Sequence, residues 1–395
     1  MLRYCYYFLS FLTFVCVYFI FIQESIDNEK TSTILPFQRQ KIDSSCILAN
    51  VIKRKENNNP DRITLVLHAS SDRIDEEIVE QIENWNAPVS LAIAFYEKNT
   101  IETIGCVSSL LRDLKNQSLK VDEFLSVHFL IENANIDCNR LALKAAEPCF
   151  QSNLPKNENL TAFEISTKLI KYPINKARNL GLQYSSTKFI LVADLGHYFS
   201  QNFEKKMRTL ANSVLEKSPK TALVYRIFET ETNATQPKTK TNLKNLMESN
   251  EAFEFHHTFN DHSIQNLSEW FETPESSDST SIQFFKDYNS AKWEPQFVSL
   301  KNIPLFDTGF RYPRRDNTVL RWEMCRAGYK FAIINDVFAF HKGLKSYTEM
   351  NFLNRVRRRL IKTTEEAFGR FSERMDLQYP KTRNKCPLIT AKSNI

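Results

Sequence analysis

Polar side chains on one predicted helix face, followed by a buried strand that ends in a carboxylate, form the clearest candidate site in this chain. Asn175, Arg178 and Asn179 recur at the i, i+3 and i+4 spacing that places them on one side of a helix. The apolar run at 189–193 is typical of a central strand covered on both faces, and it stops at Asp194. Ligands of open α/β sheets bind outside the carboxyl ends of such strands, so these residues could hold a divalent metal and a diphosphate. The alternative is an ordinary helix–strand unit in which Asp194 only caps the next turn.

The elements that must position this stretch alternate between strands and helices. Strands are predicted at 63–67, 89–95, 124–131, 189–193, 222–228 and 331–334, and helices at 76–85, 203–215 and about 316–327. This alternation predicts an α/β fold with a mainly parallel sheet. Residues 231–292 are rich in Asn, Thr, Ser, Glu and Lys and predict a long surface excursion, a usual place for acceptor recognition. Its histidines, His256, His257 and His262, are interpreted as solvated loop side chains rather than a metal cluster.

The charge pattern argues against nucleic-acid binding. The net charge is +6, and basic residues are mostly interspersed with acidic ones, which favours a role in solubility. From about residue 349 the chain is predicted to be helical and basic, and we interpret this segment as a solvated helix face. No nucleic-acid partner is therefore expected.

The N-terminus predicts a membrane anchor. Residues 4–22 are uninterrupted by charge and long enough to cross a bilayer as a helix, whereas a cleaved signal peptide has a shorter apolar region and a small-residue cleavage site. Arg3 precedes the span and acidic residues follow it, which places the bulk of the chain in the lumen. We predict a cytoplasmic tail at 1–3, a transmembrane signal anchor at 4–22, a polar stem at 23–60, a globular domain at 61–386 and a C-terminal tail at 387–395.

Cysteines and glycosylation sequons fit such a compartment. An even number of cysteines lies outside the span, which predicts one or more disulfides but leaves the pairing open: Cys46, Cys106, Cys138, Cys149, Cys325 and Cys386. No Cys/His spacing suggests zinc. Sequons that are typical of a secretory-pathway glycoprotein begin at Asn116, Asn159, Asn233 and Asn266.

Several segments together, in their order and spacing, resemble glycosyltransferase family 49. These are YPINKARNLG, FILVADLGHYFS, WEPQFV, PLFDTGF, AGYKF and AFHKG, with TLVLHASSD and IENWNAPVSLAIAF upstream and RFSERMDLQYPKTRNKC downstream. The family includes the β-1,4-glucuronyltransferase of dystroglycan glycan synthesis and the second domain of the LARGE enzymes. The resemblance covers residues 61–386 and implies a Rossmann-like GT-A fold, a UDP-sugar donor and a single-pass type II protein of the Golgi membrane.

The resemblance also implies a metal site, from which this chain departs. Family members hold Mn²⁺ with a DxD motif and a C-terminal histidine, and the metal neutralises the leaving diphosphate. The matching positions are Asp194 and His341, but the second carboxylate of the motif is replaced by Gly196. His197 is a further candidate ligand, with a structural histidine as the alternative. One carboxylate and one imidazole are few ligands for a divalent cation, so the sequence leaves open whether the protein depends on a metal.

Donor recognition is expected from the polar helix and from a basic residue after the last strand. Asn175, Arg178 and Asn179 match the family's helix that faces the nucleotide. Arg178 suits a phosphate, or Asp194 itself, through its planar fork of donors, and a surface salt bridge is the alternative. Lys342 could offer a second positive charge to the diphosphate.

An inverting transfer also needs a general base that takes the proton of the acceptor hydroxyl. Asp316, at the start of the predicted helix at 316–327, is the candidate, with Asp307, Glu323 and Glu294 as rivals. Asp316 could instead be only the N-cap of that helix.

The leading hypothesis is a Golgi-anchored glycosyltransferase that transfers a sugar, glucuronic acid by family analogy, from a UDP-sugar to a glycan or glycoprotein acceptor with inversion. The alternative is a catalytically impaired family member that acts as a lumenal glycan-binding or accessory protein, because Gly196 removes a metal ligand. A membrane-anchored structural or adhesion protein ranks last, since it would need neither the Asn/Arg helix nor the terminal histidine.

Overall fold

The computed structural model describes residues 38–387, apart from 43, 56–58, 97–100, 133–136, 140, 142–148, 151–153, 155–159 and 257–261. The predicted cytoplasmic tail and signal anchor lie outside these described residues. Within the described part of the chain, no helix is both long and apolar enough to span a bilayer.

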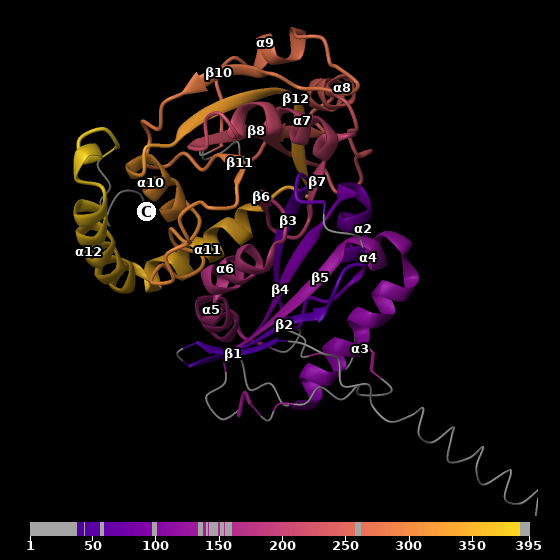
Figure 1. The fold of residues 1–395 in the computed structure, drawn as a ribbon, viewed down its shortest axis with the longest axis vertical. Helices are drawn as coiled ribbons and strands as arrows, with labels where there is room; N and C mark the ends of the chain where they lie inside the picture. The colour runs from indigo at the N-terminus through magenta and orange to yellow at the C-terminus, as the bar shows by residue number, and fades with distance from the viewer. Residues whose placement is uncertain are drawn as a thin grey trace, which may run out of the picture.

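The first half of the sheet is the parallel core that the sequence predicts (Figure 1). β3 (Ile63–Ser70), β4 (Val89–Phe95), β5 (Leu125–Ile131) and β6 (Phe189–Val192) pair in the order β5-β4-β3-β6, all in parallel. Their side chains are almost all buried, as continuous apolar runs require when helices cover both faces. The predicted α/β class is therefore confirmed.

The second half of the sheet mixes strand directions. β11 (Gln296–Leu300) lies antiparallel between β6 and β8 (Thr221–Thr230), and β8 runs parallel to the long β12 (Lys330–Lys342). β10 (Ile282–Lys286) is antiparallel to β12 at the edge, β9 (Ala252–Glu254) pairs with β8, and β7 (His197–Phe199) pairs with β12. The sheet as a whole is thus mixed, because the chain crosses back between its parallel strands.

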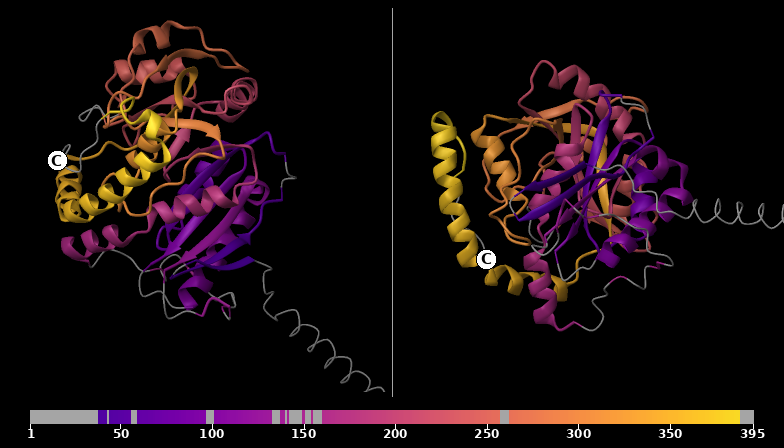
Figure 2. Two further views of the ribbon diagram at one scale, coloured as in Figure 1. Left: turned by 60° about the vertical axis from the view of Figure 1, so that its left-hand side comes forward. Right: turned by 60° about the horizontal axis from the view of Figure 1, so that its bottom comes forward.

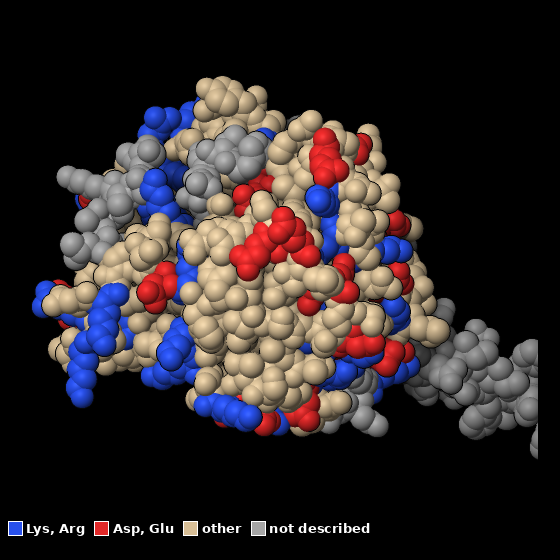
Figure 3. All heavy atoms as spheres, turned by 90° about the horizontal axis from the view of Figure 1, so that it is seen from above, with Lys and Arg blue, Asp and Glu red and all other residues tan. Residues whose placement is uncertain are grey.

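Helices cover both faces of the sheet (Figures 1 and 2). α2 (Glu76–Trp85), α3 (Ile101–Gln117), α4 (Leu119–Phe124) and α7 (Phe203–Leu215) contribute to the larger hydrophobic core on one face. α6 (Ile174–Tyr184), α10 (Thr318–Arg326) and α12 (Ile361–Gln378) pack on the other face. The remaining helices are α5 (Ala162–Lys171), α8 (Lys240–Glu248), α9 (Leu267–Glu272), α11 (Tyr347–Arg359) and the short 3-10 helix η2 (Pro380–Thr382). The face seen in Figure 3 carries basic and acidic side chains interspersed.

The predicted stem is too long at its C-terminal end. β1 (Gln38–Ile42) and β2 (Ser45–Ile52) fall inside the segment assigned to the stem, yet they extend the sheet beyond β5. β2 is buried along most of its length because it pairs with β5 and enters the main core. The sequence of β2 is one short apolar run between polar segments. Such a run has no periodicity by which a strand could be distinguished from an unstructured stem.

Within the described residues, three disulfides join segments that are far apart in the sequence, which confirms the prediction of at least one. They are Cys46–Cys138, Cys106–Cys149 and Cys325–Cys386. The third joins the end of α10 to the chain beyond η2, so it closes the C-terminal helices against the domain.

Candidate functional site

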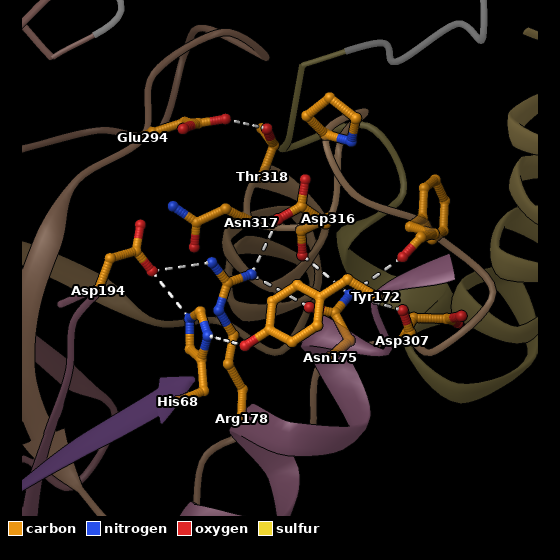
Figure 4. A network of polar contacts seen from close by, with 12 residues as sticks. His68, Tyr172, Asn175, Arg178, Asp194, Glu294, Asp307, Asp316, Asn317 and Thr318 are labelled. Atoms are coloured by element: carbon orange, nitrogen blue, oxygen red, sulfur yellow. Dashed lines mark hydrogen bonds and ion pairs between the residues drawn. The ribbon is translucent and has the colours of Figure 1, made fainter. Parts of the chain in front are cut away.

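The candidate site is centred on Asp194, just beyond the carboxyl end of β6 (Figure 4). Asp194 Oδ1 accepts hydrogen bonds from His68 Nε2 at 2.9 Å and from Arg178 Nη2 at 3.3 Å. Burial alone would raise the pKa of Asp194, but the His68 hydrogen bond and the Arg178 charge hold it well below its usual range. The side chain of Asp194 is nevertheless 54% exposed. The site therefore presents an ionised carboxylate that a ligand can reach.

His68 is a site residue that sequence reasoning missed. It lies near the end of β3, and the parallel register of β3 and β6 brings it beside Asp194. Its Nε2 faces the carboxylate, so this nitrogen carries the proton and Nδ1 accepts from the Tyr172 hydroxyl at 2.7 Å. Burial lowers the pKa of His68, which keeps the imidazole neutral. The only sequence signal was a lone histidine within an apolar strand.

Arg178 joins the two halves of the site. The side chain is buried, and its Nη1 donates to Asp316 Oδ2 at 3.0 Å while Nη2 donates to Asp194. Its guanidinium also lies 5.2 Å from the centre of the Phe306 ring. The predicted proximity of Arg178 to Asp194 is thus observed, and the alternative of a surface salt bridge does not hold because the pair with Asp316 is buried.

Asn175 and Asn179 are occupied by the loop that precedes α10. Asn175 Nδ2 donates to the carbonyl oxygens of Asp307 at 2.9 Å and Asp316 at 3.0 Å. Asn179 donates to the Phe306 carbonyl at 2.8 Å and accepts from the Phe306 N–H at 2.9 Å. Both amides therefore fasten this loop onto α6 rather than turning toward an open nucleotide site. Their contact with a nucleotide stays a prediction, and the spacing alone could not reveal which loop covers this helix face.

Asp316 is brought to the site but does not cap α10. The N-cap position of α10 is Asn317, and Asp316 is buried beneath it with its carboxylate against Arg178. Burial raises the pKa of Asp316, and the Arg178 charge opposes this shift without overcoming it. A carboxylate with a raised pKa is suited to accept a proton near neutral pH.

Among the rival bases, Glu294 is the one whose charge acts on Asp316, and Figure 4 shows it beyond Thr318. Glu294 accepts a short hydrogen bond from Thr318 Oγ1 and lies 3.9 Å from His262 Nε2. Asp307 and Glu323 instead pair with Arg374, at 3.1 and 2.8 Å. Those two carboxylates line a cavity of about 730 Å³ between the loop before α10 and α12. Asp194 does not line this cavity. We assign the chemistry to the region around Asp194, because His68, Arg178 and Asp316 form a connected set of polar contacts with it.

The predicted metal ligands do not form a metal site. His197 and His341 are cross-strand neighbours on β7 and β12, with ring centres 5.9 Å apart. Burial lowers the pKa of His197 to about 4, so this ring is neutral. In the described ranges, no group of three or more His, Cys, Asp or Glu side chains is arranged to hold a metal ion. Among the described residues, Mn²⁺ therefore finds no set of three protein donors.

The residue Gly196 explains in part why the predicted metal ligands do not form a metal site. Its φ of +83° is a conformation that favours glycine, and a Cβ at this position would lie 3.0 Å from Glu77 Oε1 and 3.4 Å from His341 Nε2. The space for a second carboxylate is thus partly taken by Glu77, a residue of α2 that the motif did not point to.

Lys342 does not approach Asp194. Its Nζ lies 2.8 Å from Glu80 Oε2 and 4.4 Å from the centre of the Tyr198 ring. Neighbouring residues of a strand point to opposite faces, so Lys342 and His341 diverge. The prediction that Lys342 contacts the diphosphate finds no support in this placement. Three residues further along, the pKa of Lys345 is lowered by burial and the Arg357 charge, and the Asp194 charge opposes this shift.

The histidines of the excursion belong to the site rather than to a solvated loop. His262 is buried, and the His256 ring stacks on Phe255 with ring centres 4.0 Å apart. Phe255 also contacts the rings of His197 and His341, at 5.7 and 6.1 Å. We call these five residues the Phe255 cluster. The sequence interpretation was wrong for His256 and His262, and His257 lies outside the described residues.

Comparison with known proteins supports a transferase assignment. Residues 62–380 match the family described as "Glycosyl-transferase for dystroglycan". Beta-1,4-glucuronyltransferase 1 of Mus musculus is 23% identical over 340 residues, which are 83% of this chain and 78% of that protein. The Danio rerio protein of the same name is 25% identical over 226 residues, covering 55% of this chain but only 50% of that protein.

The solved structures that match part of this chain include a crystal structure of GalNAc-T7 with UDP, GalNAc and Mn²⁺. Its identity is 10% and its TM-score 0.38, over 76% of this chain and 48% of that chain. Since the family match extends over most of the sequence and the described sheet has the expected α/β architecture, this protein belongs to the dystroglycan-type glycosyltransferases, glycosyltransferase family 49, and has their GT-A fold.

Proposed function

We propose that this protein transfers a sugar from a UDP-sugar to a glycan or glycoprotein acceptor with inversion at the anomeric carbon. The observation that supports it best is the ionised, accessible Asp194 at the carboxyl end of β6, held by His68 and Arg178. This is the edge of an α/β sheet at which ligands bind. Glucuronic acid is the proposed donor sugar, because the relatives named above are glucuronyltransferases.

In the proposed reaction, the acceptor hydroxyl oxygen attacks the anomeric carbon while its proton passes to Asp316. The bond between the anomeric carbon and the diphosphate oxygen breaks, and its electron pair leaves with UDP. Oδ2 of Asp316 is held by Arg178, and within the described residues Oδ1 makes no other hydrogen bond, so Oδ1 can take the proton. Arg178 fixes the orientation of Asp316 and of Asp194 at the same time.

The donor is tested by thermal unfolding of the full chain with a panel of UDP-sugars. We expect UDP-glucuronic acid to raise Tm more than UDP-galactose or UDP-N-acetylglucosamine, because a ligand stabilises the native state by mass action, by about 2.7 kcal/mol at one hundred times its Kd. The same measurement with the corresponding CDP-sugars tests whether the site prefers the uridine nucleotide. Equal shifts with every UDP-sugar would remove glucuronic acid from the proposal, and no shift with any of them would remove the donor site itself.

One observation favours a second function. The missing carboxylate at Gly196 is consistent with a non-catalytic, glycan-binding or accessory protein of the same fold. Binding of an acceptor glycan without turnover of any UDP-sugar would support this alternative over transfer.

We further propose that the chain is a type II protein of the Golgi membrane, anchored by residues 4–22. Three disulfides fit an oxidising compartment, and the sequon asparagines at 116, 233 and 266 are exposed. In secretory cells we expect endoglycosidase treatment to increase the gel mobility of the full chain. Triple substitution of these asparagines by glutamine should remove most of that change, and an unglycosylated full chain would contradict a lumenal domain.

A further inference from the structure

In the site described above, the negative charges of Asp194 and of a bound diphosphate must be balanced by positive side chains of the protein. A UDP-sugar brings a diphosphate, and the negative charge on this group increases as the glycosidic bond to the sugar breaks. Asp194 adds an ionised carboxylate at the same place. Electrostatic stabilisation of a leaving group requires positive charge that is already in position when the bond breaks.

Arg178 cannot provide this charge by itself. Both terminal nitrogens of its guanidinium already donate to carboxylates, Nη1 to Asp316 and Nη2 to Asp194. The side chain is buried, so it cannot leave these two partners without leaving charges unpaired. Arg178 is therefore neutralised within the protein.

Lys345 is in a different situation. It is exposed, and in the part of the chain that the structure describes its ammonium has one hydrogen-bond partner, the His256 Nε2 lone pair at 2.7 Å. No carboxylate in that part of the chain forms an ion pair with it. Partial burial and the Arg357 charge lower the pKa of Lys345, and the charges of Asp194, Glu229 and Glu294 oppose this shift. An exposed ammonium that pairs with no carboxylate of the described residues is well placed to bind an anion.

The position of Lys345 is set by the turn between β12 and α11. Gly343, with φ +89°, donates its N–H to the Thr230 carbonyl at 2.8 Å and ends the strand. Ser346 then begins α11 with a capping box in which its side chain and that of Glu349 bond each other's backbone N–H. Lys345 lies between these two fixed points, and its Nζ is 6.0 Å from the centre of the Phe255 ring.

The Phe255 cluster supplies the wall next to Lys345. His197 is buried there, and within the described residues its Nδ1 has no hydrogen-bond partner. His256 accepts from the ammonium through Nε2, so its ring is neutral, in agreement with a pKa lowered to about 2 by burial and the Lys345 charge. A neutral imidazole orients an ammonium without cancelling its charge.

We propose that Lys345, oriented by His256, binds the diphosphate of the donor and neutralises it in place of a divalent metal ion. This inference rests on the proposed function, since it assumes a UDP-sugar as donor. During transfer, the electron pair of the broken bond goes to the diphosphate oxygen, and the N–H groups of Lys345 donate hydrogen bonds to the developing negative charge. The proton of the acceptor goes to Asp316.

The test measures UDP binding to the full chain by titration calorimetry, once in EDTA and once in Mn²⁺. We expect UDP to bind equally in both, and Lys345→Ala to weaken UDP binding about 10- to 100-fold, as loss of a charged hydrogen bond to phosphate predicts. Uridine, which has no phosphate, should bind wild type and Lys345→Ala alike. Lys345→Arg should retain most of the affinity.

Lys342→Ala is the matched control, because Lys342 lies on the same segment but pairs with Glu80. It should change UDP affinity less than about twofold. The inference is overturned, while the proposed function stands, if UDP binds only with Mn²⁺ or if Lys345→Ala binds UDP like the wild type. If UDP binds under neither condition, the inference and the proposed function both fall.

Discussion

Substitution of Arg178 by alanine is expected to destabilise the protein by about 3–5 kcal/mol, the usual loss when one partner of a buried ion pair is removed. The pair concerned is that with Asp316, since the side chains of Arg178 and Asp316 are 4% and 10% exposed. The contact with the more exposed Asp194 adds little by itself. Without Arg178, the Asp316 carboxylate stays buried with no cation beside it, and urea unfolding at pH 7 should report the loss.

The pH dependence separates this cause from a simple packing defect. The pKa of Asp316 is already raised by burial, and removal of Arg178 raises it further. A carboxyl group with a raised folded-state pKa binds protons more tightly in the native state, so its burial costs stability as the pH rises through that pKa. The difference in unfolding free energy between wild type and Arg178→Ala should therefore narrow as the pH is lowered from 7 toward 4.

Two further variants control the experiment. Adding Asp316→Asn to Arg178→Ala should recover part of the lost stability, because no unpaired charge remains. Arg73→Ala removes an exposed pair with Glu77 and should cost less than about 1 kcal/mol. A loss below 1 kcal/mol for Arg178→Ala, or a loss that does not change with pH, would show that the buried pair is not what holds this part of the fold.

Asp316→Asn is expected to lower kcat by about 10²- to 10⁴-fold, the range typical for removal of a general base. Asparagine keeps the shape of the side chain, and Asp194 still pairs with Arg178, so UDP affinity should change little. In the wild type, kcat should rise with pH through the raised pKa of Asp316, since the base must be ionised to accept the proton. The acid limb of the pH profile should disappear in Asp316→Asn.

Glu294→Gln is the matched comparison, because Glu294 is the rival base whose charge acts on Asp316. Its pKa is lowered: burial opposes the shift, but His262, Thr318 and Arg321 outweigh it, so Glu294 is the weaker base. We expect Glu294→Gln to affect the acceptor KM more than kcat. A larger fall in kcat for Glu294→Gln than for Asp316→Asn would transfer the role of base to Glu294.

Local patterns were sufficient for the elements that carry the site. The helix face with Arg178 and the apolar strand that ends at Asp194 form as predicted, because side-chain periodicity and continuous apolar runs are properties of neighbouring residues. The α/β class follows from the same patterns. The even number of cysteines predicted disulfides, although the three pairs depend on which segments meet in space.

Tertiary structure alone decided which polar groups are available at the site. The register of β3 against β6 brings His68 to Asp194, and the loop before α10 occupies Asn175 and Asn179. After β12, Lys345 contacts His256 of the Phe255 cluster, whereas Lys342 pairs with Glu80. Each of these contacts joins residues that are tens to more than a hundred positions apart in the sequence. The different partners of Lys342 and Lys345 depend on strand alternation and on the packing of His256. The sequence by itself determined where a helix and a strand form, while long-range packing determined which of their polar groups still face solvent, because hydrogen bonds to a covering loop are invisible to local spacing.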